Sequence, residues 1–420
     1  MAIIRAMKTL LVIGYVWPEP KSSAAGSRML QLIECFQQAG FKVTYASPAA
    51  PSEHAIDYQQ HQISTCTIEL NNESFDEYIK QLQPNVVMFD RFMMEEQFGW
   101  RVEKHCPQAI RILDSEDLHC LRFARQTLAK QHPQQVIKHV SDQNLFTDQA
   151  KREIAAIYRC DLTLTISQYE MQILQQRFGV PANILLYMPF MLKQINVNTD
   201  IPFHERTHFV SIGNFRHEPN WDAVLQLKQS IWPLIRKQLP HAQLHIFGAY
   251  PPKKATQLHN EKQGFLVKGW CEDAFKELSK ARVLLAPLRF GAGLKGKLLD
   301  AAQCGLPAVT TSIGSEGLFD NNQPSTALVS DNFDQFAQLA VDLYRHETTW
   351  QQAQNACLTF LTDGFAWKTY SQAMIESLHH LANNLETHRL NNFTGSMLRH
   401  HTMKSTQYMA QWIEAKNKLN

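Results

Sequence analysis

The residues best suited to hold an anion are concentrated in one stretch of the 420-residue sequence, 286–318. A glycine loop at 291–293 precedes an expected helix from Lys295 to Cys304. The free N–H groups and the dipole of a helix N-terminus favour an anion, and glycines let a ligand approach the backbone closely. Lys295 and Lys297 add positive charge at the same place. The stretch therefore predicts a binding site for a diphosphate.

An aspartate lies on the same face of that helix as one of the lysines. Lys297 and Asp300 are three positions apart, so their side chains are neighbours on a helical surface. Asp300 could accept hydrogen bonds from the hydroxyl groups of a ribose while Lys297 holds the phosphates. The alternative is a solvated surface pair worth about 0.2–0.5 kcal/mol. The spacing alone does not decide between the two.

Two series of strands and helices must position these residues. The first begins with a strand at 9–13, a loop at 14–26, a helix at 28–39 and a strand at 42–46, which together predict one right-handed βαβ unit. Further strands are expected at 85–89, 110–113, 162–166 and 183–186. The second series has expected strands at 208–212, 243–247, 264–267, 283–286 and 308–311, helices at 221–237 and 295–304, and a helical segment from 333 onward.

The apolar periodicity is lost between the two series, at 191–206. We therefore expect a first domain at 1–195, a linker at 196–206, a second domain at 207–385 and a helical tail at 386–420. Each series starts with a strand, a glycine loop and a helix, which predicts an α/β protein of two Rossmann-like domains facing each other across a cleft. Ligands of such domains bind at the carboxyl ends of the strands.

Composition and charge limit the classes of partner. With 44% hydrophobic and 19% charged residues the chain is typical of a globular enzyme, and its net charge of +2 predicts no nucleic-acid partner. Eight cysteines without a C-x-x-C pair favour a reducing cytoplasm and argue against a zinc site. The apolar run at 10–13 is too short for a signal peptide or a membrane span. The basic, partly apolar tail at 388–420 could make weak peripheral membrane contact or pack on its own protein.

Three stretches together resemble the donor domain of the group 1, family 4-like glycosyltransferases, which have the GT-B fold. They are 286–318, with the spacing P-x-x-x-G-x-G-x-x-x-K-x-x-x-A-x-x-x-G-x-P, then VSIGNFRHEPN at 210–220 and GWCED at 269–273. The resemblance is close over 208–320 and elsewhere rests on the order of the elements. It implies transfer of a hexosyl group from a nucleotide-diphosphate sugar to a hydroxyl group of a saccharide or lipid-linked acceptor, such as a bacterial-type surface glycan or glycolipid. It also implies retention of anomeric configuration and no cofactor.

The resemblance assigns roles to residues of the second domain. Lys297 would bind the diphosphate and act in catalysis, and Asp300 would contact the ribose. Trp270 would stack on the nucleobase, or else pack as an ordinary interior tryptophan. The first glutamate of the family's Glu-x7-Glu motif is replaced here by Ala292. The expected donor contacts are Gly213, Asn214, Arg216, Trp270, Gly291, Gly293, Lys295, Asp300 and Glu316.

The loop at 14–28 of the first domain resembles the glycine-containing acceptor loop that opens this family. Gly26 and Arg28 are the expected acceptor contacts in it. The alternative is a glycine-rich turn that follows a first strand and needs no ligand.

A second segment of the first domain, RILDSEDLHCLRFAR at 111–125, resembles the Asp-x-x-Asp-Leu-His-x-x-x-Arg segment of related bacterial transferases. Its acids, histidine and arginines could position an acceptor hydroxyl, bind an acidic acceptor or bridge to the donor sugar. The alternative is a structural ion-pair network between Asp117 and Arg122 or Arg125. The functional interpretation gives catalytic roles to Asp114 and His119 and acceptor binding to Asp117 and Arg122.

No Asp-x-Asp motif occurs in the sequence, which counts against a metal-dependent transferase whose divalent ion holds the diphosphate. The helix N-terminus and Lys297 would replace the metal. Two functions of other classes remain open: a nucleotide-sugar epimerase on the same fold and a non-catalytic nucleotide-binding scaffold.

Overall fold

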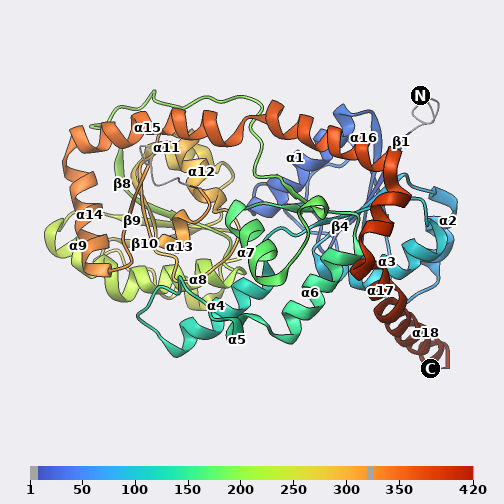
Figure 1. The fold of residues 1–420 in the computed structure, drawn as a ribbon. Helices are drawn as coiled ribbons and strands as arrows, with labels where there is room; N and C mark the ends of the chain where they lie inside the picture. Colours follow the sequence, from blue (N-terminus) through green and yellow to red (C-terminus); the bar gives the residue numbers. More distant parts are fainter. Residues whose placement is uncertain (1–7, 319–325, 420) are drawn as a thin grey trace.

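The computed structural model describes residues 8–318 and 326–419, which form two β-sheets surrounded by helices (Figure 1). The first sheet has the strand order β3-β2-β1-β4-β5-β6-β7 and the second the order β10-β9-β8-β11-β12-β13. Neighbouring strands in both sheets run parallel. The predicted α/β fold with two Rossmann-like units is thus confirmed.

The first sheet and its helices form the N-terminal lobe. Its strands are β1 (Lys8–Ile13), β2 (Phe41–Ser47), β3 (Ile63–Thr67), β4 (Val86–Asp90), β5 (Ile110–Asp114), β6 (Leu162–Thr165) and β7 (Leu185–Tyr187). Its helices are α1 (Ala24–Gln38), α2 (Ser74–Leu82), α3 (Phe92–His105), α4 (His119–Gln131), α5 (Asp142–Leu145), α6 (Asp148–Arg159) and α7 (Gln168–Phe178).

The second sheet and its helices form the C-terminal lobe. Its strands are β8 (Thr207–Ile212), β9 (Leu244–Phe247), β10 (Phe265–Gly269), β11 (Ala281–Ala286), β12 (Ala308–Thr310) and β13 (Ala327–Val329). The helices between and after them are α8 (Glu218–Gln226), α9 (Trp232–Gln238), α10 (Lys253–Thr256), α11 (Ala274–Lys280), α12 (Gly296–Gln303), α13 (Ser312–Ser315), α14 (Phe333–Arg345) and α15 (Glu347–Phe365). The chain ends in α16 (Trp367–Asn391), α17 (Phe393–Leu398) and α18 (Lys404–Leu419).

The central strands of the N-terminal sheet are nearly continuous buried runs, as parallel strands covered on both faces require. All of β4 and the last four residues of β1 are buried. Between these two strands the order of the sheet reverses, because the chain first runs outward from β1 to β2 and β3 and then returns to β4. Ligands of open α/β sheets bind at such a topological switch point.

Two long helices, α15 and α16, connect the lobes (Figure 1). Leu361 of α15 packs in the core of the C-terminal lobe, whereas Met374 and Leu378 of α16 pack in the cluster that contains the residues of β1. The second domain expected at 207–385 includes residues 367–385 of α16, whereas α16 packs on the first domain. The physical reason is that helical periodicity shows which face of a helix is apolar but not which lobe that face covers.

Candidate active site

The N-terminal end of α12 faces the N-terminal lobe. A Cβ atom at Gly296, the first residue of α12, would lie 2.7 Å from the Cβ of Ala24 at the start of α1. A Cβ atom at Gly293 would lie 2.9 Å from the Cβ of Asp117, and Gly293 has a left-handed φ of 64° that favours glycine. The glycine loop and the helix end therefore lie between the lobes, where the sequence places the diphosphate.

Lys297 extends from the first turn of α12 to the first turn of α8, the helix that follows β8. Its Nζ donates a hydrogen bond to Asn220 Oδ1 at 2.8 Å, and Asn220 Nδ2 donates one to the carbonyl oxygen of Asn214 at 3.0 Å. A Cβ atom at Gly213 would lie 2.6 Å from Asn220 Cγ. The structure thus brings together Gly213, Asn214 and Lys297, which the sequence analysis assigned to the diphosphate. Asn220, which joins them, was not named as a ligand.

The ammonium group of Lys297 has no carboxylate partner within 8–318 and 326–419. Burial, and then the charge of Lys295, lower the pKa of Lys297 to about 8. Asp300, one turn further along α12, also has no side-chain partner in this part of the chain, and burial raises its pKa to about 7. Lys297 and Asp300 do not pair with each other. Both groups are therefore available to a ligand, and an anion would stabilise the partly buried cation.

Lys295 differs from Lys297 in what holds its ammonium group. Lys295 is only 8% exposed, and its Nζ donates hydrogen bonds to the carbonyl oxygens of Gly293 at 2.6 Å and Ala292 at 3.3 Å. Burial lowers the pKa of Lys295. In this structure the ammonium group of Lys295 therefore supports the glycine loop, and its contact with the nucleotide sugar stays a prediction.

A buried ion pair between Arg125 and Glu316 crosses from one lobe to the other. Arg125 Nη1 donates to Glu316 Oε1 at 2.8 Å and Nη2 donates to Oε2 at 2.7 Å, and Nη1 also donates to the carbonyl oxygen of Gly291 at 2.8 Å. The Arg125 side chain is fully buried. Glu316 was expected among the donor contacts; in this structure each of its carboxylate oxygens accepts a hydrogen bond from Arg125, and its contact with the donor stays a prediction.

The ion-pair alternative for the segment at 111–125 is present in the structure. Arg122 Nε and Nη2 donate to the two carboxylate oxygens of Asp117 at 2.6 and 3.2 Å. Burial opposes ionisation, but the charges of Arg122 and His119 prevail and hold the pKa of Asp117 below its usual range. Burial also lowers the pKa of His119 to about 4, so its imidazole is neutral near pH 7. Acceptor binding by Asp117 and Arg122 and catalysis by His119 stay predictions.

Arg28 and Asp114 form an ion pair inside the N-terminal lobe. Arg28 Nη2 lies 2.9 Å from Asp114 Oδ1, and neither side chain has any exposed surface. Arg28 also donates to the carbonyl oxygens of Met188 and Pro189. The pair is buried in this structure, and acceptor binding by Arg28 and catalysis by Asp114 stay predictions.

Two predicted donor residues contact aromatic rings near the interface of the lobes. The indole of Trp270 stacks on the imidazole of His54 with the ring centres 4.0 Å apart and the planes at 11°. The guanidinium of Arg216 lies 3.5 Å from the ring centre of Tyr250, whose hydroxyl donates to Glu19 Oε1 at 2.8 Å. Trp270 is therefore not an interior tryptophan, and one face of its ring contacts the opposite lobe.

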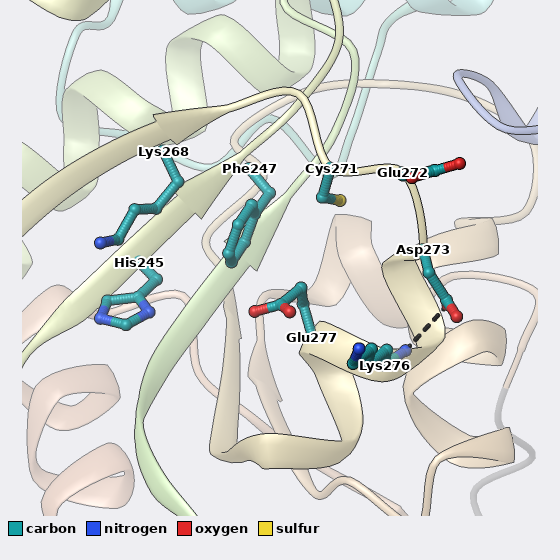
Figure 2. A pocket seen from close by; sticks show the side chains of 8 residues that line it. All are labelled: His245, Phe247, Lys268, Cys271, Glu272, Asp273, Lys276 and Glu277. Carbon is teal, nitrogen blue, oxygen red and sulfur yellow. Dashed lines mark hydrogen bonds between the residues drawn. The ribbon is translucent and has the colours of Figure 1, made fainter.

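A cavity of about 530 Å³ lies beside α11 on the C-terminal sheet (Figure 2). Its lining includes Lys268, two residues before Trp270, which is expected to stack on the nucleobase, but none of the predicted diphosphate ligands. It is therefore distinct from the region around Lys297. Its lining residues are His245, Phe247, Lys268, Cys271, Glu272, Asp273, Lys276 and Glu277.

Glu170 of α7 is a further residue of the site that the sequence analysis missed. Its Oε1 accepts hydrogen bonds from the backbone N–H groups of Leu118 at 2.8 Å and Gly293 at 2.7 Å. Burial raises the pKa of Glu170 to about 8. One carboxyl group thus fastens the glycine loop of the C-terminal lobe to the segment at 111–125. No sequence pattern could reveal it, because its partners are backbone groups far along the chain.

Gly26 is required by packing at the start of α1. A Cβ atom there would lie 2.5–2.6 Å from backbone atoms of Glu19. We expect Gly26→Ala to lower the free energy of unfolding by about 1–3 kcal/mol, since inserted atoms must displace the loop. Urea unfolding measures this, with Gly364→Ala as the control because nothing lies within 4 Å of a Cβ atom at Gly364. Equal stability of the two variants would show that the loop before α1 yields freely.

Comparison with known proteins finds a family match in the C-terminal lobe. The model of the family described as glycosyl transferases group 1 matches residues 206–346. An uncharacterized 44.6 kDa protein in the cps region of Klebsiella pneumoniae is 24% identical over 179 residues, which are 41% of this chain and 44% of that protein. The match therefore spans less than half the length of this relative.

Solved structures resemble the chain over nearly its full length. Sucrose-phosphate synthase from Thermosynechococcus elongatus has a TM-score of 0.64 and 14% identity, covering 89% of this chain and 99% of that one. HepE from Anabaena, solved in complex with UDP and glucose, has a TM-score of 0.64 and 11% identity, covering 89% of this chain and 100% of that one. At these identities the likeness shows the fold. The family match lies in the C-terminal lobe, and the chain as a whole shares the fold of these solved structures.

Proposed function

We propose that this glycosyltransferase moves a hexosyl group from a nucleotide-diphosphate sugar to a hydroxyl group of a saccharide or lipid-linked acceptor. The observation that carries the proposal is the partly buried ammonium group of Lys297, which lies beside the N-terminal end of α12 between the lobes and lacks a counter-charge in the described chain. The complexes of HepE with UDP and with UDP-glucose support a nucleotide sugar as the donor.

Breaking the bond between the sugar and the diphosphate leaves negative charge on the departing nucleotide. Lys297 and the free N–H groups of α12 are fixed before the reaction, so they stabilise that charge more in the transition state than in the bound donor. The same groups neutralise the diphosphate, and the scheme therefore needs neither a divalent ion nor a cofactor. The family likeness supports retention of configuration, with the acceptor attacking from the face that the diphosphate leaves.

The acceptor we propose belongs to polysaccharide biosynthesis, since the relative from Klebsiella pneumoniae lies in a cps region. We also propose weak peripheral membrane contact through α18, on which Tyr408, Met409 and Trp412 are between 58 and 65% exposed. Exposed aromatic and apolar side chains near lysines suit a membrane surface. None of the helices in the described ranges has the length and apolar character to cross a bilayer. The cytoplasmic location stays a prediction from the sequence.

UDP should bind the full chain with the same affinity in EDTA as in Mg²⁺, because Lys297 and α12 supply the positive charge. Isothermal titration measures this, and a loss of binding in EDTA would contradict the metal-free scheme. Incubation with nucleotide sugars in the absence of acceptor should then release free sugar slowly. An isomerised sugar would instead favour an epimerase, and failure to bind any nucleotide diphosphate would favour a scaffold.

A further inference from the structure

The switch point of the N-terminal sheet carries a cluster of charged side chains that the donor site does not use. β4 ends at Asp90 and the neighbouring strand β5 ends at Asp114. Asp90 Oδ2 accepts hydrogen bonds from the backbone N–H of Tyr15 at 3.1 Å and from Arg91 Nη1 at 2.9 Å. The carboxyl ends of three adjacent strands, β1, β4 and β5, thus meet at this cluster. Glu116 lies two residues after the end of β5.

Two residues of the cluster have strained backbones. Arg91 has a φ of 72° and Glu116 a φ of 60°, in the left-handed region that side chains other than glycine, asparagine and aspartate seldom adopt. The backbone N–H of Arg91 donates to the carbonyl oxygen of Asp114 at 2.9 Å, which fixes its conformation. Residues held against such strain cluster at ligand sites, where the surrounding structure determines a side chain's position.

Several polar atoms of the cluster lack hydrogen-bond partners. Glu116 is 9% exposed, and its carboxyl group makes no hydrogen bond or ion pair to any residue that the structure describes. Asp90 Oδ1 and Asp114 Oδ2 are also buried without a partner. Unsatisfied buried polar groups are unfavourable, so the missing hydrogen bonds point to a ligand that supplies them.

The charges of the cluster indicate what kind of ligand fits. Its two arginines are already paired, Arg91 with Asp90 and Arg28 with Asp114. Glu116 is left as the unpaired group, and burial followed by the charge of Asp114 raises its pKa well above the usual range. A neutral carboxyl group both donates and accepts a hydrogen bond, as a sugar hydroxyl does. No cation of the cluster remains free to bind a carboxylate or phosphate.

We propose that Glu116 binds hydroxyl groups of a neutral saccharide acceptor at the switch point of the N-terminal sheet. The residue after it, Asp117, lies against Gly293 of the donor loop, so an acceptor at Glu116 would border the donor site. The inference rests on the proposed glycosyl transfer and adds the chemical class of the acceptor and the side chain that selects it.

The test is the affinity of the full chain, with UDP bound, for methyl glycosides, measured by saturation-transfer NMR. The neutral probes are the methyl glycosides of glucose, galactose, mannose and N-acetylglucosamine, and the acidic probe is methyl glucuronide. We expect at least one neutral probe to bind at least about tenfold more tightly than the glucuronide. A tenfold difference in affinity is what one unpaired charge or one lost hydrogen bond typically causes. No binding of any neutral probe, or preferred binding of the glucuronide, would overturn the inference.

Glu116→Gly separates a binding residue from a structural one. Glycine relaxes the left-handed backbone, so the melting temperature should equal or exceed that of the unchanged protein. The affinity for the neutral probe should nevertheless fall by about tenfold, whereas Glu116→Gln, which can still donate and accept, should keep most of it. Glu261→Gln is the control, since that side chain is 85% exposed.

The two claims fail in different ways. If UDP binds but Glu116→Gly leaves the saccharide affinity unchanged, the inference about Glu116 is wrong and the proposed function stands. If Glu116→Gly lowers the affinity for UDP as much as that for the saccharide, Glu116 is not an acceptor residue. If the unchanged protein binds no nucleotide, the proposed function itself fails.

Discussion

Replacing Lys297 by alanine should lower the turnover of glycosyl transfer about 100- to 1,000-fold, the loss typical of removing one preorganised contact to a developing negative charge. The ammonium group lies at the start of α12 and is hydrogen-bonded to Asn220, which in turn is bonded to Asn214 in the loop after β8. Lys237→Ala is the control, because Lys237 is exposed on α9 and serves no site. The measurement is kcat, with the nucleotide sugar that the protein is found to hydrolyse when no acceptor is present.

The same lysine predicts a pH dependence of nucleotide binding. Burial and Lys295 hold the pKa of Lys297 at about 8, so its charge is present below that pH and lost above it. The affinity for UDP should therefore weaken as the pH rises from 7 to 9.5, and this decline should be absent in Lys297→Ala. An unchanged kcat in the variant, or an identical pH profile, would refute the role given to Lys297.

Arg125→Ala should lower the free energy of unfolding by about 3–5 kcal/mol, because it leaves the carboxylate of Glu316 without its buried partner. Arg125 is fully buried and Glu316 is 10% exposed, and the pair joins α4 of one lobe to the loop after α13 of the other. Replacing both residues together, by Arg125→Met and Glu316→Leu, should recover most of the loss, since no unpaired charge remains.

Denaturant unfolding followed by tryptophan fluorescence measures these changes. The matched control is Lys151→Ala, which breaks an ion pair whose side chains are 74 and 93% exposed. That variant should lose less than about 1 kcal/mol. An Arg125→Ala variant as stable as Lys151→Ala would show that the pair across the lobes does not hold them together.

The sequence predicts those elements whose apolar pattern is continuous. The strand at 9–13 and the strand at 208–212 lie within β1 and β8, and the helix expected from Lys295 to Cys304 lies within one residue of α12 at each end. β3 escaped prediction because only Ile63 of its five residues is buried, which leaves no apolar alternation to detect. β13 escaped it too, since only Ala327 of its three residues is buried.

The sequence predicts which segments form the candidate site but not which side chains in them pair with each other. The sequence indicates that the stretches at 111–125, 210–220 and 286–318 carry polar side chains on loops at strand ends. It contains no signal for the pairing of Arg125 with Glu316, which are 191 positions apart, or for the contact of Glu170 with the backbone of Gly293. The strain at Glu116 was equally hidden, because a left-handed φ at a glutamate depends on the tertiary structure around it.

The most direct test of the account is a crystal structure of the chain with UDP bound. We predict the diphosphate within hydrogen-bonding distance of Lys297 Nζ and of the N–H groups that begin α12, with the ribose hydroxyl groups bonded to Asp300. A diphosphate in the cavity beside α11 drawn in Figure 2, with Lys297 still bonded to Asn220 alone, would contradict it.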